Sequence, residues 1–429
     1  MAAAFASRRA DDRWFCWERP GRGRLAIGAI GSTVELISRG EDRFADLLAD
    51  AARISSARLG AEPKGGMPTA AGPLWVGGFA FDPDGGGTPP WSSLPPAMMA
   101  VPEVLMRRDD EGSMLTLTAM AGAGRDPEEI SSRAAARLAG VRVEPLPPID
   151  PDPVAGVSVE SARSPADYER AVAEGVKQIR AGGMRKIVLS REVVVDAHAA
   201  HDVAALFGAL RELFDSCFCF CVGSPEAAFV GASPELLVRR AGATAATVAL
   251  AGSARRSADP SVDDHLGEQL RASPKDRDEH RIVVERIRRK LAPAAVWLDS
   301  PDEPSVVKVA NIQHLATPIR AQLADPPSVL GLAAMLHPTP AVGGEPGGPD
   351  AQRRIRELER MDRGWYAGPV GWMDMAEDGE FCVALRSALI RDRRAHLYAG
   401  AGIVADSDPA AELAETEVKL GALLPLLAG

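Results

Sequence analysis

Residues 368–405 read GPVGWMDMAEDGEFCVALRSALIRDRRAHLYAGAGIVA, and this stretch decides the fold. Runs rich in β-branched and aromatic residues alternate with short polar turns such as EDGE (377–380), a pattern typical of strands joined by tight turns. We predict three successive strands, within 368–375, 380–392 and 395–405. Strands joined by such short turns run antiparallel, so the stretch indicates an antiparallel sheet.

Further elements are expected on both sides of this stretch. Residues 165–182 begin with Pro165, carry apolar residues at helical spacing and end in glycines, which predicts a helix. KIVLSREVVVD (186–196) is β-branched and alternating, which predicts a strand. We also expect helices at 201–213 and 279–293 and strands at 218–223 and within 227–240. A last helix begins at DSDP (406–409), where Ser407 or Asp408 provides the cap.

A proline-rich stretch, EPLPPIDPDPVAG (144–156), is the clearest linker candidate, and 82–97 and 337–350 are loop-rich. Residues 73–86 and 113–129 weakly repeat 366–379 and 395–412. The repeat indicates either a duplication, with each half contributing one antiparallel sheet, or a chance likeness in a chain rich in alanine and glycine.

The composition excludes several classes of protein. Of 429 residues, 46% are hydrophobic and 25% charged, which is ordinary for a globular protein and excludes a disordered or fibrous chain. The net charge of -10 argues against nucleic acid as a partner, and an anionic substrate would require a local positive pocket. No run approaches 18 apolar residues and the first residues lack a signal peptide's apolar stretch. We therefore expect no membrane segment and a cytoplasmic location.

Five cysteines are too few and too unevenly spaced for a disulfide framework. Cys217, Cys219 and Cys221 stand in CFCFC, where alternation places all three on one face of a strand. The alternatives are a metal or redox role and burial as small hydrophobic residues, of which burial is the better interpretation.

Glycines 400 and 402 in AGAG (399–402) let backbone N–H groups approach an anion, so this turn is either a carboxylate or phosphate cradle or a plain glycine-rich turn. In the following helix Glu412, Glu415 and Lys419 share one face. A surface ion pair is the simple explanation. With Glu279 of SPKDRDEH (273–280), the two glutamates would alternatively form a Mg²⁺ site.

Ten motifs occur in order between about residues 157 and 425. They are KIVLSR (186–191), FVGASPELL (229–237), LAGSARR (250–256), SPKDRDEH (273–280), QHLATP (313–318), LHPTPAVGG (336–344), YAGPVGW (366–372), GEFCVALRSA (379–388), AGAGIV (399–404) and SDPAAELAETEVK (407–419). Together they resemble the chorismate-utilising enzyme family, which includes anthranilate synthase component I. The resemblance implies an α/β (α+β) fold of two antiparallel β-sheets packed as a sandwich with surrounding helices. Residues 1–150 would form the N-terminal half and 157–429 the chorismate-binding catalytic region of one compact unit.

In this family a nucleophile attacks C2 of chorismate beside Mg²⁺ and the C4 hydroxyl leaves. When the nucleophile is water, a lysine acts as general base and a glutamate as general acid, and Lys186 and Glu235 match these positions. The lysine must be neutral to accept a proton, so the site has to disfavour its charge. Glu235 must be protonated, so its pKa has to rise.

The resemblance also assigns metal and substrate contacts. Glu279, Glu412 and Glu415 match the Mg²⁺ site, where the metal would hold the ring carboxylate. Arg386 matches an arginine that clamps the enolpyruvyl carboxylate, and His314 a histidine near the leaving hydroxyl. The other positions that the resemblance places around the substrate are Ser253, Ala316, Thr317, Ala341, Tyr366, Gly400, Gly402 and Lys419.

Differences at the motifs separate the branches of the family. Aminating branches lack the lysine and need a glutaminase, whereas Lys186 is present here, so we expect no glutaminase subunit. The family resemblance also implies a monomer. Ser253, Ala316–Thr317 and Ala341 resemble the branch that forms isochorismate, because salicylate-forming relatives tend to carry threonine at the first and last of these positions. We expect conversion of chorismate to isochorismate with Mg²⁺. The alternatives are salicylate formation, an aminating reaction and a degenerate scaffold without activity, and the menaquinone, siderophore and salicylate pathways all remain open.

Overall fold

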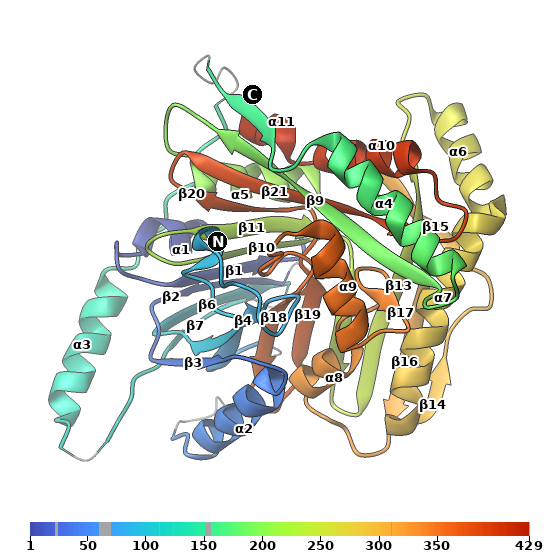
Figure 1. Cartoon of the computed structure of the whole chain (residues 1–429). Coiled ribbons are helices and arrows are strands. Elements are labelled where there is room, and N and C mark those ends of the chain that lie inside the picture. The colour runs from blue at the N-terminus through green and yellow to red at the C-terminus, as the bar shows by residue number, and fades with distance from the viewer. Residues whose placement is uncertain are drawn as a thin grey trace.

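Two large β-sheets dominate the computed structural model, which describes residues 1–21, 25–59, 70–110, 112–122, 124–150, 156–309 and 311–428 (Figure 1). All strand pairings among these residues are antiparallel. A continuous apolar core, with Trp17 and Phe220 from one sheet and Trp75 and Phe381 from the other, fills the space between them. The predicted sandwich of two antiparallel sheets is confirmed.

The 11-stranded sheet, called sheet A, has ten strands in a continuous order and β8 (Ser158–Ser161) paired with β9. That order is β17 (Gly344–Glu345), β9 (Lys186–Asp196), β21 (Arg394–Ile403), β20 (Ser387–Arg391), β11 (Ala228–Ser233), β10 (Phe218–Gly223), β1 (Trp14–Glu18), β2 (Ala26–Ile30), β6 (Val104–Asp109) and β7 (Gly112–Leu117).

The 10-stranded sheet, called sheet B, likewise has one strand, β15 (Ser305–Val309), outside its main order, paired with β16. That order is β14 (Ala295–Asp299), β16 (Ile312–Leu323), β13 (Thr244–Arg255), β12 (Leu236–Ala241), β19 (Gly379–Val383), β18 (Pro369–Asp374), β4 (Leu74–Phe79), β5 (Ala97–Val101) and β3 (Val34–Ser38).

Each sheet contains strands from both halves of the chain. Strand β10 pairs with β1 in sheet A, and β18 pairs with β4 in sheet B. The idea that each half supplies one complete sheet is therefore wrong, since each half supplies part of both. The two segments that the weak repeat linked, in β4 and β18, lie side by side as hydrogen-bonded neighbours.

Helices cover the sandwich, and α4, α9 and α10 pack against β9 or β21 (Figure 1). The α-helices of the described residues are α1 (Ala2–Ser7), α2 (Arg43–Ser56), α3 (Pro127–Ala139), α4 (Pro165–Arg180), α5 (Val203–Leu213), α6 (Pro260–Ala272), α7 (Pro274–Leu291), α8 (Val329–Leu336), α9 (Pro349–Glu359), α10 (Pro409–Leu420) and α11 (Leu424–Ala428). Short 3-10 turns, η1 (Pro89–Trp91) and η2 (Ala292–Ala294), complete them. Asp408 caps α10 by accepting a hydrogen bond from the Ala411 N–H, as the sequence predicted.

The chain crosses from one sheet to the other at two places that later carry functional side chains. Strand β11 of sheet A is followed directly by β12 of sheet B, and β19 of sheet B by β20 of sheet A. Residues 380–392 therefore form two strands, and the prediction of a single strand there is wrong. The break falls at Arg386, whose φ of 47° lies in the left-handed region and cannot continue a strand.

A second apolar core lies on the other side of sheet A, under α5 and α11. It contains Cys16, Cys219 and Cys221, which are free thiols with 0% exposure. Burial raises the pKa of Cys16 to about 12 and that of Cys221 further. These cysteines pack as small apolar residues, which agrees with the preferred interpretation of the CFCFC motif.

The predicted linker and loops take different forms. Residues 144–150 have no regular structure, while 151–155 of the proline-rich stretch lie outside the described residues. The 82–97 stretch contains η1 and leads into β5, and the 337–350 stretch contains β17 and the start of α9. Among the described helices, none combines the length and apolar character needed to cross a bilayer.

Candidate active site

A cavity opens between the two sheets where β9 and β21 of sheet A face β13 and β16 of sheet B. Residues from both crossings, from α7 and from α10 close it. Its lining consists of Val188, Pro234, Glu235, Leu250, Ala251, Gly252, Ser253, Glu279, His314, Ala341, Val342, Tyr366, Leu385, Arg386, Tyr398, Ala399, Gly400, Gly402, Glu415 and Lys419. Most of the predicted site residues are in this set.

Lys186 is the first residue of β9 and its side chain is completely buried. Its Nζ lies 2.9 Å from Oε1 of Glu279, which is on the second turn of α7. The two side chains meet beside Gly402: a Cβ there would lie 2.2 Å from Glu279 Oε1 and 3.0 Å from Lys186 Cε. A side chain at 402 would therefore displace this pair.

Glu235 lies in the crossing from β11 to β12, and it is 4% exposed. The backbone fixes it tightly, because the Glu235 N–H donates to the Ser233 hydroxyl and the Val383 N–H donates to the Glu235 carbonyl. Burial raises the pKa of Glu235 to about 8, against the lowering effect of the Lys186, Arg386 and Lys419 charges. At neutral pH this carboxyl group is protonated, as a general acid must be.

Arg386 lies in the crossing from β19 to β20, and its carbonyl accepts a hydrogen bond from the Ala232 N–H near the end of β11. Its guanidinium is buried and donates to His314 Nε2 at 3.2 Å, while no ion pair joins it to a carboxylate in the described part of the chain. Its Nε has no hydrogen-bond partner there either. A buried, unpaired guanidinium is costly unless an anion meets it, so this geometry suits a carboxylate ligand.

His314 is a neutral link between Arg386 and the backbone. Burial lowers its pKa to about 3, and the charges of Arg386 and Lys419 add to that effect. Its Nδ1 lies 3.2 Å from the Gly252 carbonyl, so Nδ1 carries the proton and Nε2 accepts from Arg386.

Gly400 and Gly402 line the cavity from β21, opposite Ser190 and Val188 of β9. A Cβ at 400 would lie 2.4 Å from the Ser190 hydroxyl oxygen, so only glycine leaves this surface flat. Lys419 donates from Nζ to the Gly400 carbonyl at 2.8 Å, which anchors α10 to the strand. The two glycines therefore provide backbone rather than side-chain surface, as a carboxylate cradle requires.

The three glutamates predicted to hold Mg²⁺ each contact a lysine. Besides the Lys186–Glu279 pair, Lys275 Nζ lies 2.8 Å from Glu412 Oε1, and Lys419 Nζ lies 2.6 Å from Glu415 Oε1. Among the described residues no three acidic, histidine or cysteine side chains converge on one point.

Glu412 and Glu415 nevertheless lie close enough for the charge of one to affect the pKa of the other. Burial raises the pKa of Glu412, and the charge of Glu415 raises it further. Burial acts in the same direction on Glu415, but Lys419 and the Ser253 hydroxyl, which donates to it at 2.8 Å, hold its pKa below its ordinary value. Glu412 is buried, and Glu279 and Glu415 are partly buried. Carboxylate oxygens are hard ligands of the kind that Mg²⁺ binds, so the chemistry of these three side chains suits the ion.

Four predicted positions lie outside the cavity lining, namely Lys186, Glu412, Thr317 and Ala316. Thr317 is buried on β16, and its hydroxyl is 2.8 Å from His280 Nε2 of α7. It borders a separate hollow between α7 and residues 301–304. Ala316 is buried in β16 opposite Leu250, which does line the cavity.

The sequence interpretation overlooked three polar or aromatic neighbours of the site. Tyr398 lines the cavity and stacks on Tyr366, with 5.2 Å between the ring centroids. It stands two residues before Gly400 on a strand, and this spacing could have placed both residues on the same face. Lys275 stands one helical turn before Glu279, which places both on one face of α7. Thr339, which lowers the pKa of Glu235, comes from the 337–350 loop, and no local pattern pointed to it.

Comparisons with known proteins show which proteins this chain resembles. A family model described as chorismate binding enzyme matches residues 2–428. The salicylate biosynthesis isochorismate synthase of Pseudomonas aeruginosa is 38% identical over 420 residues, covering 95% of this chain and 83% of that protein. The isochorismate synthase MenF of Bacillus subtilis is 35% identical over 361 residues, covering 84% and 76%. The solved structure of MenF, the menaquinone-specific isochorismate synthase from Escherichia coli, superposes with a TM-score of 0.81 at 27% identity, covering 100% of this chain and 91% of that one.

Proposed function

The chain belongs to the chorismate-binding enzyme family, and on that premise we propose that it is an isochorismate synthase, an isomerase that converts chorismate to isochorismate. The observation that carries the proposal is the protonated Glu235 facing the same cavity as Arg386, with Lys186 buried at its edge. The names of the relatives, all isochorismate synthases, support the same activity.

The reaction moves a hydroxyl group around the ring of chorismate. Lys186, in its neutral form, takes a proton from a water molecule whose oxygen bonds to C2. The ring double bonds shift, the C4–O bond breaks, and Glu235 donates its proton to the departing hydroxide, which leaves as water. One water enters and one leaves, and a proton returned from Lys186 to Glu235 through solvent restores the enzyme. Burial favours the protonated form of Glu235, which is the form that a general acid needs.

Substrate orientation depends on the two carboxylates of chorismate. We assign the enolpyruvyl carboxylate to Arg386, whose fork of donors has no acidic partner in the described residues. Tyr366 and the flat backbone surface of Gly400 and Gly402 would complete that end of the site. Ser253, His314, Ala341 and Lys419 line the remaining wall.

Glu279, Glu412 and Glu415 would hold a Mg²⁺ ion. When bound, it supplies positive charge that fixes the ring carboxylate and offsets its repulsion from the glutamates. Each of these glutamates contacts a lysine, and these contacts offset the negative charge of the cluster.

We further propose that the chain acts in the cytoplasm, as a monomer and without a glutaminase subunit. The buried Lys186 supports the last point, because it suits activation of water rather than use of ammonia.

Product analysis tests the proposed function. The purified chain is incubated with chorismate and Mg²⁺, without ammonia, and the products are separated by chromatography with mass detection. A new compound with the mass of chorismate, which reverts to chorismate, is the expected result. Salicylate with pyruvate would instead show that the site also eliminates the enolpyruvyl group, and turnover only with ammonia would show an aminating enzyme.

A further inference from the structure

We propose that Arg255 is a steering residue at the rim of the cavity, where its unpaired charge draws the chorismate dianion into the site. The inference rests on the proposed function and adds a residue that acts on substrate binding rather than on the chemistry.

The alternation of strand β13 places Arg255 on the side of the active site. Ser253, two residues earlier, lines the cavity and donates its hydroxyl to Glu415 at 2.8 Å. Residues two apart on a strand share a face, so Arg255 lies on that face too, one step nearer to the end of the strand. Arg256 is on the opposite face, and its Nε donates to Asp263 of α6 at 2.8 Å.

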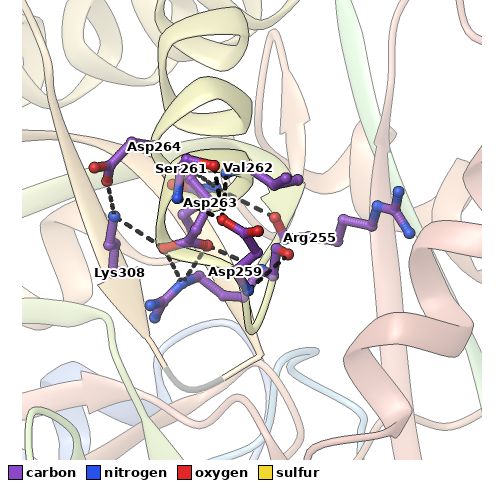
Figure 2. A network of polar contacts seen from close by, with 10 residues as sticks. Arg255, Asp259, Ser261, Val262, Asp263, Asp264 and Lys308 are labelled. Carbon is purple, nitrogen blue, oxygen red and sulfur yellow. Dashed lines mark hydrogen bonds and ion pairs between the residues drawn. The ribbon is translucent and has the colours of Figure 1, made fainter.

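Arg255 is exposed, and among the described residues its guanidinium has no hydrogen bond and no ion pair. Figure 2 shows its side chain extending away from the neighbouring acidic cluster of Asp259, Asp263 and Asp264. That cluster is neutralised from elsewhere, because Lys308 Nζ lies 2.9 Å from Asp263 Oδ2 and 2.6 Å from Asp264 Oδ1. The charge of Arg255 is therefore free to act on a ligand.

The end of β13 is held close to the helix that carries the glutamates. The Arg256 N–H donates to the Asn311 carbonyl, and the Asn311 side-chain amide donates to the Val418 carbonyl of α10 at 2.6 Å. Glu415 and Lys419 are on the same helix. Arg255 thus stands at the border between the β13 wall and the α10 wall of the cavity.

The charges inside the cavity explain why an extra cation at the rim matters. Lys186 and Lys419 each pair with a glutamate, so their fields are largely cancelled for a distant anion, which leaves Arg386 as the cavity-lining cation without an acidic partner among the described residues. The chain as a whole carries a net charge of -10. A dianion approaching such a protein is repelled unless a local cation compensates. At a separation of about 10 Å in water, one added charge changes the affinity for a dianion by roughly three- to fivefold.

Steady-state kinetics of Arg255→Ala, Arg255→Lys and Arg255→Glu test the inference. We expect Arg255→Ala to raise KM for chorismate by roughly three- to fivefold and Arg255→Glu by roughly tenfold or more, with kcat unchanged and with KM largely restored in Arg255→Lys. Since screening shortens to a few ångströms near 1 M salt, the differences should shrink there toward none. Arg133→Ala is the matched control, because Arg133 is an exposed arginine on α3, at the opposite end of the molecule (Figure 1).

An unchanged KM in Arg255→Ala and Arg255→Glu would overturn the steering role, and so would a change that is independent of salt or equal to that of Arg133→Ala. A fall in kcat with unchanged KM would also overturn it. If the unmodified chain does not turn over chorismate, the proposed function itself fails, and that result is distinct from a working enzyme that is indifferent to Arg255.

Discussion

Nζ of Lys186 lies 2.9 Å from Oε1 of Glu279, so the proposed general base and a proposed metal ligand are in direct contact. The lysine opens a strand and the glutamate belongs to a helix much later in the chain, and they meet beside a glycine that leaves room for both. Catalysis and metal binding are thereby coupled at one point. Substitutions at the two positions should nevertheless have different signatures.

Lys186→Ala should reduce turnover by about 10²–10⁴-fold, the usual contribution of a general base. Chorismate and Mg²⁺ should still bind, because Arg386 and the glutamates remain. Stopped assays with equilibrium binding measurements check both parts, and Lys177→Ala, an exposed lysine on α4, is the control. Near-normal turnover in Lys186→Ala would remove this residue from the role of base.

Glu235 should limit activity at alkaline pH. Its pKa of about 8 means that the acid form is lost as the pH rises through 8, so kcat should fall over that range. Glu235→Gln should abolish turnover at every pH, while Glu226→Gln, on an exposed glutamate, should keep the profile. A profile with no alkaline fall near 8 would contradict the assignment.

The same buried carboxyl group should make stability depend on pH. Between the unfolded pKa of about 4.3 and the folded pKa, the folded chain holds a proton that the unfolded chain has released, so the free energy of unfolding falls by about 1.4 kcal/mol per pH unit as the pH rises. Glu235→Gln removes this dependence and should gain in stability over the wild type from pH 5 to pH 8. Denaturant unfolding of both proteins at pH 5 and pH 8 measures their free energies of unfolding. A difference between the two proteins that stays the same at both pH values would show that Glu235 is not buried in its neutral form.

Glu279→Ala should shift the Mg²⁺ activation curve to higher concentration by at least about tenfold, since a lost charged contact costs about 1.5–3 kcal/mol. Calorimetric titration with Mg²⁺ gives the same comparison without turnover. Glu285→Ala, on an exposed face of the same helix, is the matched control. An unchanged curve in Glu279→Ala would exclude this residue from the metal site.

Arg386→Lys should raise KM for chorismate by about tenfold, because an ammonium group cannot reproduce the two parallel hydrogen bonds of a guanidinium to a carboxylate. Arg394→Lys, on the exposed end of β21, is the control. Substrate titrations of both variants check this, and equal KM values in the two would show that Arg386 does not hold a carboxylate.

Local pattern predicted individual elements well where a residue's neighbours in sequence decide its conformation. Strand β9 has the bounds expected from its β-branched alternation, and α10 begins at the predicted Asp–Pro cap. The break at Arg386 was missed because EFCVALRSALIRD contains no glycine or proline to mark it, and the left-handed conformation there is set by the crossing between sheets. Pairings such as β4 with β18 join distant segments, and no local signal carries them.

In the candidate site, too, local spacing could be read from the sequence, whereas contacts between distant segments could not. Glutamates and glycines at helical or strand spacing could be placed on common faces, but the partners of Lys186, Glu412 and Glu415 depend on which helices meet, so the three lysine contacts were not foreseen. The raised pKa of Glu235 was required by the expected chemistry, and its cause, burial at the crossing between sheets, became visible only in the structure.

Isotope incorporation tests the central claim most directly, namely that Lys186 and Glu235 exchange a hydroxyl group of chorismate for one derived from water. The enzyme, chorismate and Mg²⁺ are mixed in ¹⁸O-labelled water and the isochorismate formed is analysed by mass spectrometry. We predict that isochorismate gains one heavy oxygen in the wild type and that no labelled product forms in Lys186→Ala or Glu235→Gln. Isochorismate without the label, or labelled product at the wild-type rate in either variant, would contradict the account.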